Sequence, residues 1–168
     1  LVEESIQIYE LPQPDWIIAD VGSSIYHRDP HGWSLLAPWS QHIAVDWQGF
    51  SGVDLAACLS GLPGLELQPD DRQNSHKLSY FVSLNADLPA LMEAIGARLA
   101  ERNWKANLIY SVDEQVAIGL LDILPQRANK LAAIEFLMRK HGFTADQTLF
   151  AGDSGNDLAV LTSSLPAV

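Results

Sequence analysis

The hexapeptide Gly152–Asp157 (Gly-Asp-Ser-Gly-Asn-Asp) lies between two short apolar runs, Thr148–Ala151 and Leu158–Leu161. A short apolar run that ends at a turn signal predicts a buried strand, and the apolar run after the loop predicts the start of a helix. In an open α/β sheet, the loops at the carboxyl ends of the strands form the ligand crevice. This stretch therefore predicts an α/β fold with the loop at its ligand-binding edge.

Two interpretations fit the polar residues of this loop. Asp153 and Asp157, with Ser154 and Asn156 between them, offer the hard oxygen ligands that suit magnesium. Alternatively, the same residues form a surface turn whose side chains only cap the helix that follows. The spacing alone favours neither interpretation.

A basic residue, Lys130, begins the next candidate helix upstream, which ends at Gly142 after a basic last turn. A helix dipole disfavours a cation at the amino-terminal end, so Lys130 is better explained if an anion such as phosphate shares the site. The alternative is a solvated lysine, because the unfavourable field costs only roughly a few tenths of a kcal/mol.

Taken together, these motifs resemble those of a known group of enzymes. Pro125–Lys130 and Gly152–Asp157 resemble the third and fourth motifs of the haloacid dehalogenase superfamily. The most similar branch is the sucrose-phosphate phosphatases, including the phosphatase-like domain of bacterial sucrose-phosphate synthases. The similarity extends to Pro14–Tyr26 and Lys77–Tyr80, so it runs through most of the chain in the same order.

The resemblance implies a partial Rossmann-like core with a large inserted α+β cap lobe. Residues 1–30 and 125–168 would form the core, and residues 31–124 the cap. Independently, the candidate helices and alternating strands of the middle region predict helices packed on an antiparallel sheet. Hydrophobic content of 48% with only 18% charged residues also indicates a folded chain.

For the phosphate end of the site, the resemblance implies a role for each matching residue. Asp153 would bind magnesium, and Lys130 would neutralise the phosphoryl oxygens while Asp157 orients it. Asn156 and Ser23 would contact the phosphate. For Ser23 an equally good explanation needs no ligand, because its side chain can cap the turn after the predicted strand Trp16–Val21.

For the sugar, the resemblance implies contacts from Gln73, Asn74 and Lys77 in the cap. The alternative for Lys77 is an exposed lysine on a strand. Arg72 stands where the family has an acidic residue, which departs from its pattern of hexose contacts.

Four apolar residues lie at helical spacing near the start of the expected cap: Trp39, Ile43, Trp47 and Phe50. Tryptophans can stack on sugars, but an aromatic stripe at helical spacing is more often part of a hydrophobic core. We therefore predict that this stripe is buried.

Two elements that the resemblance requires do not occur in these 168 residues, namely the Asp-x-Asp motif that carries the nucleophile and a Ser or Thr followed by Gly-Arg. We expect both to precede Leu1 in a longer parent protein. Residues 1–168 alone would then be inactive, and their core strand edges would be exposed and able to associate with other chains.

The net charge, the length of the apolar runs and the cysteine content limit the classes of partner and compartment that fit this chain. A net charge of −11 argues against nucleic acid and anionic membranes, and no apolar run approaches the roughly 20 residues that span a bilayer. A single cysteine, Cys58, excludes an internal disulfide and fits a cytoplasmic protein.

The sequence thus predicts a magnesium-dependent phosphatase of sucrose 6-phosphate or a close relative, which would use an aspartyl-phosphate intermediate. Two alternatives stay open. One is a non-catalytic, phosphatase-like module of a sugar-phosphate synthase. The other is a phosphatase of a different glycosyl phosphate, such as a mannosyl or glucosyl glycerate phosphate.

Overall fold

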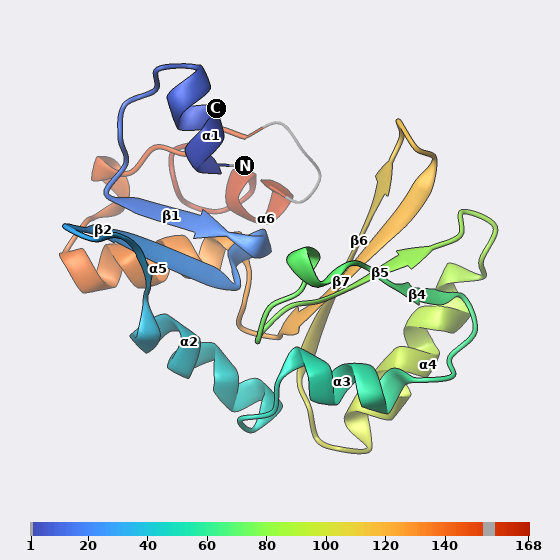
Figure 1. Cartoon of the computed structure of the whole chain (residues 1–168). Helices are drawn as coiled ribbons and strands as arrows, with labels where there is room; N and C mark the ends of the chain where they lie inside the picture. The colour runs from blue at the N-terminus through green and yellow to red at the C-terminus, as the bar shows by residue number, and fades with distance from the viewer. Residues whose placement is uncertain (1, 153–156) are drawn as a thin grey trace.

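The structure is a computed structural model that describes residues 2–152 and 157–168, and its strands form two antiparallel sheets (Figure 1). The first sheet has the order β1-β2-β3, with β1 (Trp16–Ala19), β2 (Ser24–Asp29) and β3 (Gly32–Leu35). The second has the order β4-β5-β7-β6, with β4 (Leu65–Leu67), β5 (Leu78–Val82), β6 (Ala106–Asp113) and β7 (Ile118–Pro125).

We call the first sheet and the helices packed with it the core lobe. Its helices are α1 (Val2–Ile8), α2 (Ala37–Ala44), α5 (Lys130–His141) and α6 (Leu158–Leu161). Its buried cluster comprises Ile25, Leu36, Trp39, Ile43, Leu124, Ala128 and Ala133. Residues from both sides of the predicted boundary at residue 30 therefore pack together, and the domain limits stay a prediction.

The second sheet and the helices α3 (Gly52–Leu59) and α4 (Leu88–Ala100) form the cap lobe (Figure 1). Alternation in β5 turns Leu78, Tyr80 and Val82 toward these helices. The helices contribute Leu55, Leu59, Leu91, Ile95 and Leu99 to the same buried cluster. The predicted antiparallel sheet with helices packed on it is thus confirmed.

The helix α5 has the ends that its sequence predicts. Asn129 caps the amino terminus by accepting a hydrogen bond from the backbone N–H of Ala132 at 2.8 Å. At the other end, Gly142 adopts the left-handed conformation that closes a helix. Lys130 is therefore the first residue of a well-defined helix, at its positive end.

Two predicted core strands differ from the structure. The run Trp16–Val21 stops pairing at Ala19, because Asp20 and Val21 adopt left-handed backbone conformations (φ 52° and 58°) that cannot continue a strand. The run Thr148–Ala151 does not form a strand. Phe150 makes a single bridge to Ala167 in the last residues of the chain, which is too short a pairing for a ladder.

The aromatic stripe is buried as predicted for three of its four residues. Trp39 and Ile43 are fully buried in the core lobe, whereas Trp47 is fully buried in the cap lobe. Phe50 departs from the prediction, since it is about half exposed and lies beside Trp104.

A buried carboxylate, Asp46, lies where the chain passes between the lobes. Its Oδ2 accepts a hydrogen bond from the backbone N–H of Arg127 at 2.8 Å, and its backbone carbonyl accepts one from Lys105 at 2.9 Å. The bond from Arg127 joins the segment that leaves the core lobe to the segment that returns to it, whereas the bond from Lys105 joins Asp46 to the residue before β6. The return segment leads directly into Lys130.

Burial within the cap lobe raises the pKa of Tyr80 to about 12. Because a tyrosine in the unfolded chain ionises near pH 10, only the unfolded state loses this proton between about pH 10 and 12. The free energy of unfolding should therefore fall with rising pH in that window. We expect Tyr80→Phe to remove about 1 to 3 kcal/mol of this alkaline loss, measured by urea denaturation at each pH. An equal effect of Tyr9→Phe, at an exposed tyrosine, would contradict this assignment.

No helix within the described part of the chain is long and apolar enough to cross a membrane.

Candidate active site

A crevice of about 530 Å³ lies in the core lobe. It is lined by the turn after β1, the first turn of α5, the segment Phe150–Gly152 and Asp157, the residue before α6. Its polar side chains are Asp20, Lys130 and Asp157. The crevice therefore brings together residues that are distant in the sequence.

An ion pair between Lys130 and Asp157 is the main charged feature of this crevice. The Lys130 Nζ atom lies 2.5 Å from Oδ1 of Asp157. The carboxylate is nearly buried, whereas 29% of the Lys130 side chain is exposed to solvent. A buried carboxylate holds an ammonium more firmly than a solvated one does, because water screens the attraction less. The structure thus places Lys130 and Asp157 in contact, whereas the roles that the resemblance implies for them stay predictions.

The turn after β1 is packed tightly against the start of α5. At Gly22 a Cβ atom would lie 2.3 Å from the carbonyl carbon of Asn129 and 2.6 Å from the backbone nitrogen of Lys130. Gly22 also has φ +99°, which side-chain-bearing residues rarely adopt. The indole Nε1 of Trp39 donates a hydrogen bond to the Gly22 carbonyl at 3.1 Å. A glycine is therefore required here, and its turn fixes the position of Lys130.

Ser23, a predicted phosphate contact, is nearly completely buried in this turn. Its hydroxyl donates a hydrogen bond to the backbone carbonyl of Asp20 at 3.0 Å, which matches the turn-capping alternative. Its role as a phosphate contact stays a prediction.

Asp20 is a site residue that the sequence reasoning missed. Its carboxylate accepts a hydrogen bond from the Ser24 hydroxyl at 2.9 Å and lines the crevice beside Lys130. The signal in the sequence is a carboxylate near the end of a candidate strand, two residues before the turn glycine. Because the apolar run predicts a strand through Val21, the sequence places Asp20 inside the strand and not at the crevice.

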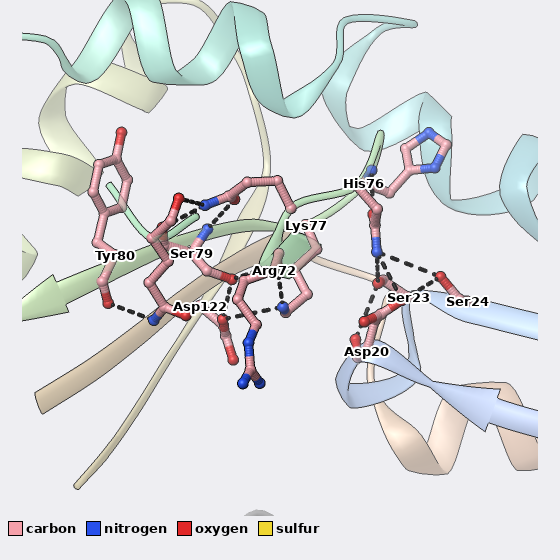
Figure 2. Close-up of polar contacts among 12 residues, drawn as sticks. Asp20, Ser23, Ser24, Arg72, His76, Lys77, Ser79, Tyr80 and Asp122 are labelled. Atoms are coloured by element: carbon pink, nitrogen blue, oxygen red, sulfur yellow. Dashed lines mark hydrogen bonds and ion pairs between the residues drawn. The ribbon is translucent and has the colours of Figure 1, made fainter. Parts of the chain in front are cut away.

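The three predicted sugar contacts lie on one segment of the cap lobe, residues 73–77, which we call the cap loop. Figure 2 shows one of them, Lys77, beside Arg72 and Asp122. Two of them, Gln73 and Lys77, bind other residues of the cap lobe. The Gln73 side chain donates to the Ser79 carbonyl at 2.9 Å and accepts from the Ser79 N–H at 2.8 Å. Lys77 Nζ donates to the Arg72 carbonyl at 2.6 Å and lies 3.8 Å from Asp122. Lys77 is only 8% exposed, so the alternative of an exposed strand lysine is wrong.

The third predicted sugar contact, Asn74, reaches across to the core lobe. Its amide Nδ2 donates a hydrogen bond to Oδ2 of Asp20 at 2.9 Å. Its amide oxygen accepts one from the backbone N–H of His76 at 2.8 Å. Burial lowers the pKa of the His76 imidazole, which favours its neutral form at pH 7. The assignment of Gln73, Asn74 and Lys77 as sugar contacts stays a prediction.

Asp153, the predicted magnesium ligand, and Asn156, a predicted phosphate contact, lie outside the described residues. Within residues 2–152 and 157–168, no group of three or more His, Cys, Asp or Glu side chains could hold a metal ion. The roles of Asp153 as a magnesium ligand and of Asn156 as a phosphate contact therefore stay predictions.

Comparison with known proteins places this crevice in context. A sequence model of the sucrose-6F-phosphate phosphohydrolase family matches residues 1–168. A HAD-like hydrolase from Nitrosococcus oceani is 45% identical over all 168 residues, which are 45% of its own length. A mannosylfructose-phosphate phosphatase from Agrobacterium fabrum is 31% identical over 163 residues, which cover 95% of this chain and 61% of that protein.

Among solved structures, the sucrose-phosphatase from Synechocystis sp. PCC6803, determined with sucrose and phosphate, superimposes with a TM-score of 0.78 at 31% identity. The match covers 99% of this chain and 63% of that protein. The predicted fold class is therefore confirmed. The chain spans about half the length of the curated relatives described above.

Proposed function

The chain belongs to the sucrose-6F-phosphate phosphohydrolase family, and on this basis we propose that it forms the phosphate-binding and sugar-reading part of a glycosyl-phosphate phosphatase. The observation that carries the proposal is the Lys130–Asp157 ion pair in the core crevice, beneath a cap lobe that contacts the crevice wall. We propose this activity for a longer parent protein, which would supply the motifs that these 168 residues lack.

In the proposed reaction, Lys130 binds the phosphoryl oxygens of the substrate. Negative charge is spread over these oxygens in the transition state of phosphoryl transfer, so a positioned ammonium lowers the barrier. Asp157 keeps the ammonium directed into the crevice. The amino-terminal end of α5, where Lys130 lies, adds a favourable field for the same anion.

We assign the nucleophile to a carboxylate of the parent protein outside residues 1–168. It would attack phosphorus while the bond from phosphorus to the sugar oxygen breaks, and water would then hydrolyse the aspartyl-phosphate and release phosphate. Magnesium, which we propose to bind at Asp153, would supply further neutralisation of the phosphoryl charge.

The substrate class follows from the relatives. One matching protein is a mannosylfructose-phosphate phosphatase, and one matching structure is a sucrose-phosphatase that holds sucrose and phosphate. We therefore propose a phosphorylated disaccharide, or a similar glycosyl phosphate, as the substrate. The cap lobe would exclude water from the crevice and read the sugar.

Phosphate release by the full-length parent, with magnesium present, tests this function. We compare sucrose 6-phosphate and mannosylfructose phosphate with 4-nitrophenyl phosphate, which has no sugar. A remote sugar contact accelerates only substrates that carry the sugar, so kcat/KM for one disaccharide phosphate should exceed that for the aryl ester by about 100-fold or more. Residues 1–168 alone should show no turnover.

Equal kcat/KM values for all three esters would contradict a sugar-reading function. No turnover of any ester by the full-length parent would instead support the non-catalytic module of a synthase.

A further inference from the structure

The hydrogen bond between Asp20 and Asn74 joins residues 54 positions apart and crosses from one lobe to the other (Figure 2). We infer that Asp20 is a positioning residue that docks the cap loop over the Lys130 crevice. The inference rests on the proposed function, because it explains what positions the sugar-reading cap lobe relative to the phosphate-binding Lys130.

On the core side, Asp20 is held rigidly. Its carboxylate accepts from the Ser24 hydroxyl, and its backbone carbonyl accepts from the Ser23 hydroxyl and the Ser23 backbone N–H. Two residues further along, Gly22 lies against the peptide between Asn129 and Lys130. Any movement of the Asp20 turn is therefore transmitted to the first residue of α5, which carries the phosphate-binding ammonium.

On the cap side, the partner of Asp20 is held just as firmly. The backbone N–H groups of Asn74 and Lys77 donate to each other's carbonyls at 3.1 and 3.3 Å, which closes the loop. A Cβ atom at Gly52 would lie 3.0 Å from the Asn74 carbonyl, so the start of α3 packs directly on the loop. The Asn74 amide is thus presented to the core lobe by a preformed loop.

The contact itself is a charge-assisted hydrogen bond. The acceptor is a carboxylate, the Nδ2 to Oδ2 distance is 2.9 Å, and the hydroxyls of Ser23 and Ser24 lie 3.5 Å from the same nitrogen. A hydrogen bond to a charged group stabilises more than one between neutral groups, so this contact helps to set the position of the cap loop between the two lobes.

Backbone strain supports a functional role for this turn. Asp20 and Val21 both have positive φ, and for the β-branched Val21 this is a rare conformation. Such residues persist where the surrounding structure fixes them, and they occur preferentially at functional sites. Here the strain directs the Asp20 carboxylate toward the cap loop.

A misplaced loop should affect sugar recognition more than phosphate chemistry. The sugar and the phosphate of one substrate are held by different lobes, and loss of a remote contact that binds the ground state and the transition state equally raises KM with little change in kcat. We therefore expect Asp20→Ala in the full-length parent to raise KM for the disaccharide phosphate about tenfold while kcat falls less than threefold. Asp20→Asn keeps a carbonyl acceptor for the Asn74 amide and should restore KM to within about threefold of the wild type.

A double-mutant cycle tests whether Asp20 and Asn74 act through one contact. Asn74→Ala should raise KM in the wild-type background and produce less than a twofold further change in the Asp20→Ala background. Independent, multiplicative effects of the two substitutions would overturn the inference.

Hydrogen exchange of residues 73–77 gives a second readout that needs no substrate. Asp20→Ala should increase exchange in this peptide at least fivefold. The matched control is Asp29→Ala, which removes a carboxylate of β2 that accepts hydrogen bonds from Ser34 and His31 inside the core lobe. This variant should leave hydrogen exchange in residues 73–77 unchanged. Unchanged exchange in Asp20→Ala would overturn the docking role. Increased exchange in a parent that hydrolyses no glycosyl phosphate would instead support the docking contact and refute the proposed function.

Discussion

Replacing Gly22 with alanine is expected to destabilise the parent protein by about 3 kcal/mol or more. A left-handed conformation costs a residue with a Cβ roughly 1 to 2 kcal/mol, and Gly22 has φ +99°. The new methyl group would also overlap the peptide between Asn129 and Lys130, with contacts of 2.3 to 2.6 Å to backbone atoms. Backbone cannot rotate away as a side chain can, so α5 must shift, and overpacking of this kind typically costs a further 1 to 3 kcal/mol, roughly.

The chain offers a matched control for this prediction. Gly49 has a similar φ of +83°, but nothing lies within 4 Å of the position that its Cβ would take. Gly49→Ala thus carries the conformational cost without the overlap. We expect the free energy of unfolding, from urea denaturation, to fall at least about 1.5 kcal/mol more in Gly22→Ala than in Gly49→Ala. Equal losses would show that the turn and α5 are not packed as described.

The periodic elements of this fold were predictable because their burial follows from sequence alone. The alternation of Leu78, Tyr80 and Val82 places one face of β5 against helices, and the Asn129 and Gly142 caps define α5. The alternation in β5 and the caps of α5 depend only on residues close together in the sequence. The local sequence therefore suffices to predict both elements.

The run Thr148–Ala151 was predicted to be a strand and does not form one. An apolar run becomes a strand only if a neighbour satisfies its backbone groups, and here Phe150 alone makes a bridge, through backbone hydrogen bonds with Pro166 and Val168. The early end of β1 has a different cause, namely the left-handed backbone of Asp20 and Val21, which begins a turn that packs against Asn129 and Lys130 far along the chain.

In the site, too, contacts between recognisable motifs were predictable, whereas contacts that depend on how distant segments meet were not. Contact between Lys130 and Asp157 was predictable from the resemblance, because both residues belong to recognisable motifs. The engagement of Asn74 by Asp20 was not, since it depends on how two lobes meet. Likewise, the burial of Lys77 depends on the Arg72 carbonyl and Asp122, which lie 5 and 45 positions away in the sequence.

The central claim is that Lys130 stabilises the transferring phosphoryl group. Lys130→Ala removes the ammonium that Asp157 holds at 2.5 Å in the crevice. Removal of one positioned charged donor from a transition state costs roughly 10²- to 10³-fold in kcat. Lys130→Arg keeps the charge but replaces a compact ammonium by a longer planar group, so it should restore only part of the rate.

The most direct measurement is kcat of the full-length parent for its best glycosyl phosphate, with magnesium, in Lys130→Ala and Lys140→Ala. Lys140 lies on the exposed last turn of the same helix, so its removal controls for the loss of one positive charge from α5. We predict that kcat decreases about 10²-fold or more in Lys130→Ala and changes less than twofold in Lys140→Ala. Urea denaturation should show that both variants are folded. A folded Lys130→Ala variant whose kcat stays within threefold of the wild type would contradict the role assigned to this crevice.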